Sequence, residues 1–269
     1  MKNLSNKSFQ TRAVHAGERV PPAEYRPVAT PIWPTVGYLY ESMHDLDAVF
    51  ERTKPGQVYL RYSNPTVEAF ENAVASLEMA EAAQAYSSGM AAIHAALLGC
   101  GVRAGTCVVA ALDIYGATFS LLRSLLSTLG VNVRMVDVSN LDEVQAAVRE
   151  DAVCLLAESI SNPLLKVANI PELASIAHQH GASLLVDNTF ATPWLSNPLI
   201  HRADYVMHSA TKYISGHGDV LAGVVATSQE NKNKLFELNK LMGSVLGPYE
   251  AWLALRGLKT LPLRVKQQC

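Results

Sequence analysis

Two hydrophobic periodicities alternate along the middle of the chain. Short apolar runs rich in Val, Leu and Ala occupy six stretches: residues 106–112, 132–138, 152–158, 183–187, 205–208 and 221–227. Their length and composition predict buried strands. Between several of them apolar residues recur at helical spacing, as at Leu122, Leu125 and Leu126 or Leu173, Ile176 and Ala177. This alternation predicts an α/β fold, with a mostly parallel sheet sandwiched by helices.

Helix boundary signals agree with this pattern. Pro171 suits the first turn of a helix, and Gly181 suits the position just after its end. Another helix is predicted from Thr66, with apolar side chains on one face at Val67, Phe70, Val74 and Leu77. Residues 1–60 instead hold five prolines between positions 21 and 34 and little sustained periodicity. We therefore expect an extended N-terminal arm there.

Composition and charge limit the kinds of molecule that the protein is expected to bind. The net charge is −2 and 17% of the 269 residues are charged, so neither nucleic acid nor a membrane surface is an expected partner. The apolar runs are too short to span a bilayer, and residues 1–10 lack the apolar stretch of a secretory signal. The four cysteines show no paired spacing, so we expect neither a disulfide framework nor a metal site. These features predict a cytoplasmic protein.

Polar residues cluster directly after four of the predicted strands, at 113–118, 158–163, 187–189 and 208–212. In open parallel sheets, ligands bind outside the carboxyl ends of the strands. The four clusters therefore predict one shared site.

Lys212 stands in the last of these clusters, between Thr211 and Tyr213. Most lysines are solvated surface charges, but a lysine at a strand end is also placed to attack an aldehyde and form a Schiff base. Ser209 and Thr211 would then donate hydrogen bonds to a phosphate. The spacing Ser209-x-x-Lys212 also matches serine acyl-enzymes, but their companion motifs Ser-Asp-Asn and Lys-Thr-Gly do not occur.

Each of three further features has two interpretations, one structural and one chemical. Ser88 and Gly89 precede a predicted helix over residues 91–98, and they either cap it or open an anion site at its N-terminus. Asp187 ends a strand, and it either caps the next turn or pairs with a protonated pyridine nitrogen. Tyr115 is either a half-buried loop residue or a ring that stacks on a planar cofactor.

The chemical interpretations converge on pyridoxal 5'-phosphate (PLP), with a lysine for the aldehyde, a carboxylate for the ring nitrogen and a helix start for the phosphate. A dinucleotide-binding dehydrogenase is disfavoured, because no G-x-G-x-x-G follows a strand.

Six motifs then appear in a familiar order: residues 59–66, 88–90, 113–116, 162–163, 187–189 and 208–213. Together they resemble the PLP enzymes of Cys/Met metabolism, which include cystathionine γ-synthase, cystathionine γ-lyase, methionine γ-lyase and the homoserine-ester sulfhydrylases. The resemblance extends from about residue 11 to 264. It implies the fold-type I PLP-dependent transferase large domain at 61–260, after an N-terminal arm at 1–60. It also implies that 261–269 begin a C-terminal domain that is missing from the chain.

The resemblance also implies roles for individual residues. Lys212 would hold PLP and shuttle protons, and Tyr115 would stack on the ring and help protonate the leaving group. Asp187 would pair with the ring nitrogen and Asn162 would lie near the ring hydroxyl. The remaining residues of the site would be Ser88, Gly89, Met90, Ser209 and Thr211, the last four at the phosphate.

Tyr59 and Arg61 would reach the phosphate of a neighbouring subunit, because the planar guanidinium matches phosphate geometry. The active unit would then be a homodimer, commonly within a homotetramer, with active sites shared between subunits.

The implied activity is γ-elimination or γ-replacement on a sulfur amino acid or an activated homoserine, as in transsulfuration and methionine metabolism. Residues 115–119 and 215–219 look like the methionine γ-lyase branch, whereas Ala117 and Asn239 depart from that branch. The substrate therefore stays open. The family's arginine for the substrate carboxylate lies in the C-terminal domain, so the alternative expectation is a PLP-binding fragment or subunit without independent activity.

Overall fold

The apolar runs of the central chain form the strands of one sheet. The computed structural model describes residues 4, 6–18, 27–51 and 53–269. Within these residues seven strands are present: β1 (Ala82–Tyr86), β2 (Cys107–Ala111), β3 (Asn132–Val136), β4 (Ala152–Glu158), β5 (Ser183–Asp187), β6 (Tyr205–Ser209) and β7 (Gly223–Thr227). All six predicted strands are therefore confirmed, and β1 was not predicted.

The sheet runs in the order β1-β7-β6-β5-β4-β2-β3. Strands β3, β2, β4, β5 and β6 are mutually parallel, while β7 lies antiparallel between β6 and β1. The predicted mostly parallel sheet is confirmed. The parallel strands all end at one edge, which brings their carboxyl termini together.

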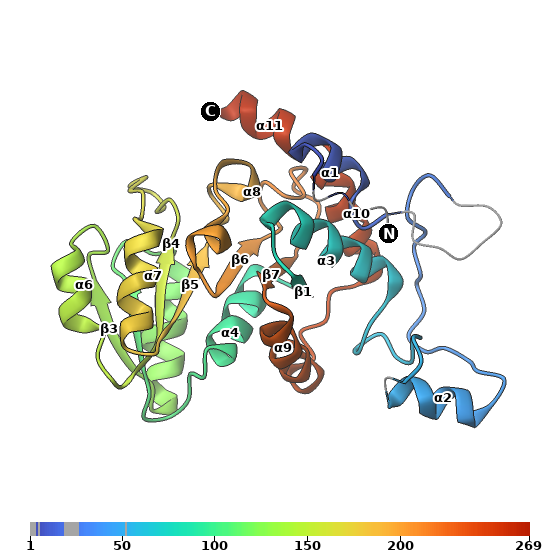
Figure 1. Ribbon diagram of the computed structural model, residues 1–269, viewed down its shortest axis with the longest axis horizontal. Coiled ribbons are helices and arrows are strands. Elements are labelled where there is room, and N and C mark those ends of the chain that lie inside the picture. Colours follow the sequence, from blue (N-terminus) through green and yellow to red (C-terminus); the bar gives the residue numbers. More distant parts are fainter. Residues whose placement is uncertain (1–3, 5, 19–26, 52) are drawn as a thin grey trace.

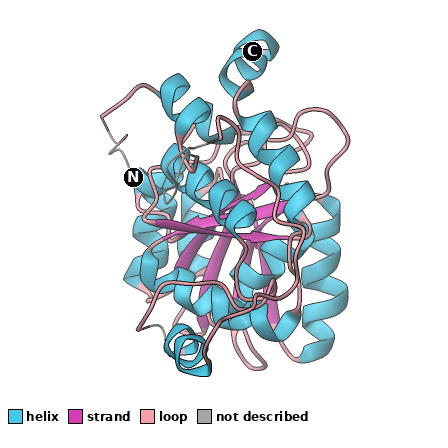
Figure 2. Ribbon diagram, turned by 90° about the vertical axis from the view of Figure 1, so that its right-hand side faces the viewer, coloured by secondary structure: helices cyan, strands magenta, loops and turns pink. Residues whose placement is uncertain are grey.

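Helices cover both faces of this sheet (Figures 1 and 2). One face carries α4 (Gly89–Gly99), α5 (Gly116–Ser120), the π-helical turn η1 (Leu121–Leu126), the turn η2 (Ser127–Leu129) and α9 (Gln229–Met242). The other carries α3 (Pro65–Glu78), α6 (Leu141–Ala147), α7 (Ile170–Gln179), α10 (Pro248–Leu258) and α11 (Leu261–Gln268). Alternate strand residues separate the two cores, since Val108 belongs to the first and Val109 to the second. The short helices α8 (Thr192–Leu195) and η3 (Pro198–His201) connect β5 to β6.

In the described part of the segment predicted to be extended, two short helices form, α1 (Phe9–His15) and α2 (Met43–Phe50), and residues 1–3, 5, 19–26 and 52 of that segment lie outside the described residues. Each begins at a serine whose hydroxyl accepts a backbone N–H, from Thr11 at Ser8 and from Asp45 at Ser42. Such local caps stabilise short helices that hydrophobic periodicity alone does not reveal. α2 stands away from the layered body in Figure 1.

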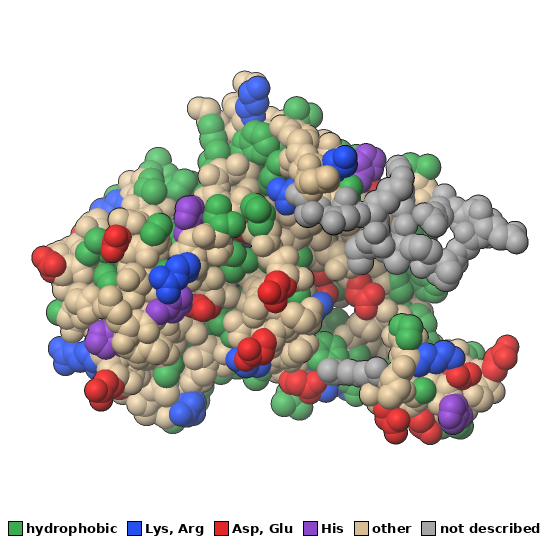
Figure 3. All heavy atoms as spheres, viewed as in Figure 1, with side chains coloured by type: hydrophobic (Ala, Val, Ile, Leu, Met, Phe, Trp, Pro, Cys, Tyr) green, Lys and Arg blue, Asp and Glu red, His purple; other side chains and the backbone are tan. Residues whose placement is uncertain are grey.

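Charged side chains of both signs are interspersed on the face shown in Figure 3. Among the described residues, no helix is long and apolar enough to cross a membrane. Cys107 and Cys154 are buried in β2 and β4, as their apolar surroundings predict.

Candidate active site

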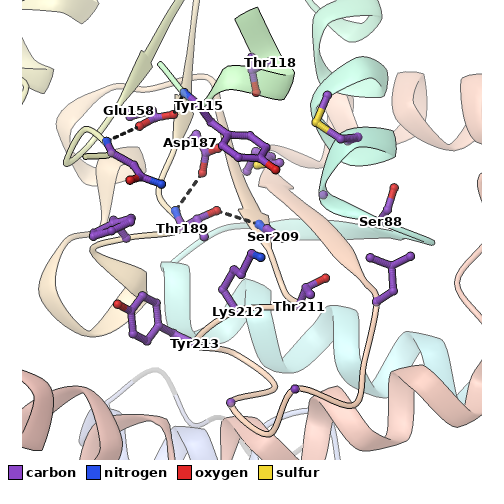
Figure 4. Close-up of a pocket in the computed structure, with 18 of the residues that line it drawn as sticks. Ser88, Tyr115, Thr118, Glu158, Asp187, Thr189, Ser209, Thr211, Lys212 and Tyr213 are labelled. Carbon is purple, nitrogen blue, oxygen red and sulfur yellow. Dashed lines mark hydrogen bonds between the residues drawn. The ribbon is translucent and has the colours of Figure 1, made fainter. Parts of the chain in front are cut away.

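The carboxyl edge of the parallel strands opens into a cavity of about 660 Å³. The loops after β2, β4, β5 and β6 line it together with the start of α4 (Figure 4). Nine of the eleven residues singled out in the sequence meet there: Ser88, Gly89, Met90, Tyr115, Asn162, Asp187, Ser209, Thr211 and Lys212. All four polar clusters of the sequence contribute to this one site.

Lys212 lies in a tight turn directly after β6. Its backbone N–H donates to the carbonyl of Ser209 at 3.2 Å, and its own carbonyl accepts the N–H of Gly216 at 2.9 Å. The side chain is exposed and points into the cavity, on the side opposite Tyr115 and Asp187 in Figure 4. The lysine amine is thus held by a fixed backbone while staying accessible to a ligand.

Arg264 of α11 stabilises this turn through hydrogen bonds to its backbone carbonyls. Its guanidinium donates to the carbonyl of Tyr213 at 2.6 Å and to that of Ile214 at 3.2 Å. It also donates to the carbonyl of Gly257 in α10 at 2.8 Å. The turn that carries Lys212 is therefore tied to both C-terminal helices.

Asp187 is the last residue of β5 and only 9% exposed. Burial raises the pKa of Asp187, while hydrogen bonds from Thr189 and the charge of His208 oppose this effect. One of the Thr189 bonds, from its N–H to Oδ1 of Asp187, is 3.0 Å long. No side-chain cation lies within ion-pair distance of Asp187 among the described residues. The carboxylate caps its turn and still faces the cavity, so both interpretations of Asp187 hold geometrically.

Glu158 also lines the cavity, although no motif of the sequence identified it individually. It ends β4 and is the register partner of Asp187 on β5. Its carboxylate accepts the backbone N–H of Tyr115 at 2.6 Å and that of Asn162 at 3.1 Å. Burial, followed by the charge of Asp187, raises the pKa of Glu158 to about 7. Glu158 thus holds together the two loops that present Tyr115 and Asn162.

The start of α4 forms the opposite wall. The hydroxyl of Ser88 accepts the N–H of Ala91 at 3.1 Å, so Ser88 is the N-cap. A Cβ on Gly89 would stand 2.8 Å from Cβ and Oγ of Ser209. The start of the helix can therefore lie this close to the end of β6 only because residue 89 is a glycine. The positive end of the α4 dipole, at Gly89 and Met90, consequently faces the cavity.

Thr211 and Tyr115 differ in how firmly they are held. The Thr211 hydroxyl donates to the carbonyl of Ala222 at 3.1 Å and accepts its N–H at 3.0 Å. The side chain of Tyr115 is 47% exposed, and its ring lies over the cavity in Figure 4.

Tyr59 and Arg61 do not line this cavity. Arg61 Nη1 donates to the carbonyl of Lys240 at 2.6 Å, and the guanidinium lies 5.6 Å from the ring centre of Tyr59 and 5.2 Å from that of Tyr62. The Tyr59 side chain is 42% exposed. Within a single subunit these two residues are separate from the other nine.

Comparison with known proteins gives a consistent picture. Residues 10–269 match the family model described as Cys/Met metabolism PLP-dependent enzyme. The chain is 41% identical over 269 residues to an L-methionine gamma-lyase of Fusobacterium nucleatum, covering 99% of this chain and 67% of that protein. It is 47% identical over 209 residues to a cystathionine beta-lyase of Lactococcus lactis, covering 77% of this chain and 54% of that protein.

A similar solved structure is that of a putative O-acetylhomoserine (thiol)-lyase from Campylobacter jejuni, described as carrying N'-pyridoxyl-lysine-5'-monophosphate. It is 28% identical with a TM-score of 0.88, over 97% of this chain and 73% of that one. The chain thus spans between about half and three quarters of the length of these three proteins.

Proposed function

The chain belongs to the Cys/Met metabolism PLP-dependent enzymes, and we propose that it eliminates or replaces a group at the γ-carbon of a sulfur amino acid or an activated homoserine. The observation that carries the proposal is the placement of Lys212 in one cavity with the buried carboxylate of Asp187 and the N-terminus of α4.

These residues fit PLP by their chemistry. Asp187 is a buried carboxylate without a cationic side-chain partner among the described residues, which suits a protonated ring nitrogen. The α4 N-terminus and Ser209 suit the phosphate, and Lys212 suits the aldehyde. Bound PLP supplies an aldehyde for the substrate amine and a ring that withdraws electrons from the substrate.

The chain's own residues then orient the substrate and move protons. We assign to Lys212 Nζ the transfer of protons at the substrate carbons, since the amine is accessible and its backbone is fixed. We assign to the Tyr115 hydroxyl the protonation of the leaving group, because the ring lies over the same cavity. Asn162 is assigned to the ring hydroxyl, and Glu158 keeps Tyr115 and Asn162 in place through their backbones.

The quaternary arrangement is a further part of the proposal. Arg61 and Tyr59 are placed at the phosphate of a neighbouring subunit, in a homodimer or homotetramer with shared sites. Exposed apolar side chains on the N-terminal segment, among them Leu39, Met43 and Phe50, support a covered surface there. The free thiols of Cys100, Cys107 and Cys154 suit a reducing compartment, so we place the enzyme in the cytoplasm.

A second candidate is β-elimination from cystathionine, favoured by the 47% identity to the Lactococcus cystathionine beta-lyase. Cystathionine itself separates the two reactions. Cleavage at the γ-carbon releases cysteine, ammonia and 2-oxobutyrate, whereas cleavage at the β-carbon releases homocysteine, ammonia and pyruvate.

The test is a substrate panel of methionine, cystathionine and O-acylhomoserines supplied with a thiol, assayed with the PLP-loaded protein. We expect 2-oxobutyrate or a new thioether, and neither product from the Lys212→Ala variant. Pyruvate from cystathionine would select the second candidate. No product from any member of the panel would contradict both.

A further inference from the structure

A second polar cluster lies behind the strand ends that carry the candidate active site. It consists of Glu78 at the end of α3, Asn188 directly after β5 and His208 in β6, and we call it the buried triad. Their side chains are 0%, 0% and 1% exposed. None of the three lines the cavity.

The triad is joined through the Glu78 carboxylate. Nε2 of His208 lies 2.5 Å from Oε1 of Glu78, and Nδ2 of Asn188 donates to the same oxygen at 2.9 Å. Asn197 Nδ2 donates to the other oxygen of Glu78 at 3.4 Å. A hydrogen bond in which the acceptor is an ionised carboxylate is stronger than one between neutral groups.

Two members of the triad, Asn188 and His208, belong to the same strand ends as the site, but their side chains point to the opposite side. Side chains alternate along β6, so Met207 and Ser209 face the cavity while His208 points behind the sheet. Asp187 likewise lines the cavity, and Asn188 follows it on the other side. The backbone N–H of Asn188 donates to the carbonyl of Met207 at 2.8 Å, which joins the two strand ends.

Stability alone does not explain a polar triad in this position. Burying a carboxylate and an imidazole costs desolvation, and apolar side chains of similar volume usually serve a core equally well. Two further atoms, Nδ1 of His208 and Oδ1 of Asn188, are buried without a hydrogen-bond partner in the described structure. A buried polar atom without a partner is uncommon in a native fold.

We propose that Glu78 and His208 form a positioning pair that sets the charge and the place of Asp187 in the cofactor site. This inference rests on the proposed function, in which Asp187 meets the ring nitrogen of PLP. The contact with the Glu78 carboxylate holds the His208 imidazole in place, and the charge of His208 favours the ionised form of Asp187. Burial acts in the opposite direction on Asp187 and raises its pKa.

The test compares PLP binding by the full chain and by Glu78→Gln, which keeps the shape of the side chain and removes its charge. We expect the variant to bind PLP about tenfold more weakly, because Asp187 is less often ionised. A ring nitrogen that is less often protonated also withdraws fewer electrons from the bond to Lys212. The pH midpoint of the visible absorption band of bound PLP should therefore move upward.

Asp204→Asn is the matched control. Asp204 accepts a hydrogen bond from His178 at 2.9 Å and one from the N–H of Leu184 at 2.7 Å, at the opposite end of β5 and β6. Asp204→Asn should lower the melting temperature and leave PLP affinity and the absorption midpoint unchanged. An unchanged affinity and midpoint in Glu78→Gln, or equal changes in Asp204→Asn, would overturn the inference.

The double variant Glu78→Gln with His208→Gln covers the case in which the single variant does not fold. It removes both charges and keeps an amide donor facing an amide acceptor. We expect the same loss of PLP affinity, and wild-type affinity would overturn the inference. Failure of the unsubstituted protein to attach PLP to Lys212 would instead contradict the proposed function itself.

Discussion

Glu158 and Asp187 are register partners on neighbouring strands, and the charge of Asp187 disfavours the ionisation of Glu158. The pKa of Glu158 is raised to about 7, well above its value of 4.5 in an exposed chain. Between these two pH values the folded protein binds more protons than the unfolded chain. The free energy that Glu158 contributes to folding is therefore largest below pH 4.5 and is lost as the pH rises to about 7.

The variant Glu158→Gln should remove this pH dependence from the PLP-free protein. It also gives up one acceptor for the N–H groups of Tyr115 and Asn162, so it should be less stable than wild type at pH 4.5. The stability difference should shrink by about 1–3 kcal/mol between pH 4.5 and 7.5. Urea unfolding across that range measures it, and a constant difference would contradict the raised pKa of Glu158.

Local motifs were sufficient to predict some of the residues that line the cavity and not others. Asp187 ends a predicted strand and Lys212 follows one, both within short polar clusters, so position along the chain singled them out. Glu158 also ends a strand, but its role depends on the N–H of Tyr115, which is 43 residues away in sequence. Glu78 reaches His208 across 130 residues. Contacts of that separation are set by tertiary packing, which periodicity does not encode.

The same contrast between local sequence patterns and tertiary contacts applies to the strands. Strands β2, β4, β5, β6 and β7 were predictable because each is a largely apolar run that is buried, whereas the edge strand β3 is only partly buried. β1 has the sequence AAQAY, with alanines and a glutamine that favour no strand. It pairs with β7 antiparallel at the edge of the sheet, and Gln84 donates to Glu71 of α3 at 3.0 Å. Tertiary pairing therefore decides the structure of β1.

The close approach of α4 to β6 yields a prediction at this scale. Gly89→Ala places a Cβ 2.8 Å from the side chain of Ser209 and 3.1 Å from its Cα, so the helix start must move away from the strand end. We expect PLP affinity to fall by about tenfold or more, since the phosphate loses aligned N–H donors. Equilibrium titration of the PLP-free protein with PLP measures this change.

Gly99→Ala is its control at the other end of the same helix. Its Cβ would stand 2.9 Å from the flexible Leu235 side chain, so packing is crowded to a similar degree. This variant should lose stability of about 1–3 kcal/mol and keep wild-type PLP affinity. If both variants lost PLP affinity equally, the α4 N-terminus would have no special role at the phosphate.

At the scale of the whole molecule, a single subunit does not explain the position and the exposed apolar side chains of the N-terminal segment. Tyr59 and Arg61 were predicted as cofactor-binding residues, yet they lie outside the cavity of their own chain. α2 stands apart from the layered body, and its Met43 and Phe50 side chains are exposed. An assembly in which this segment reaches a second subunit accounts for both observations.

Arg61→Ala should weaken PLP binding by about tenfold to a hundredfold without unfolding the subunit, the usual effect of losing a charge-assisted hydrogen bond. Mixing Arg61→Ala with Lys212→Ala subunits then tests whether the site is shared. Each mixed dimer would contain one intact site and one doubly damaged site, so tight PLP binding should return in part. No recovery after proven subunit exchange would place Arg61 within its own site.

The central claim is that this chain binds PLP covalently at Lys212. Reducing the PLP-loaded protein with borohydride and mapping the labelled peptide by mass spectrometry tests it most directly. We expect the label on the peptide that contains Lys212 and no label in Lys212→Ala. A label on any other lysine, or persistent labelling of Lys212→Ala, would contradict the claim.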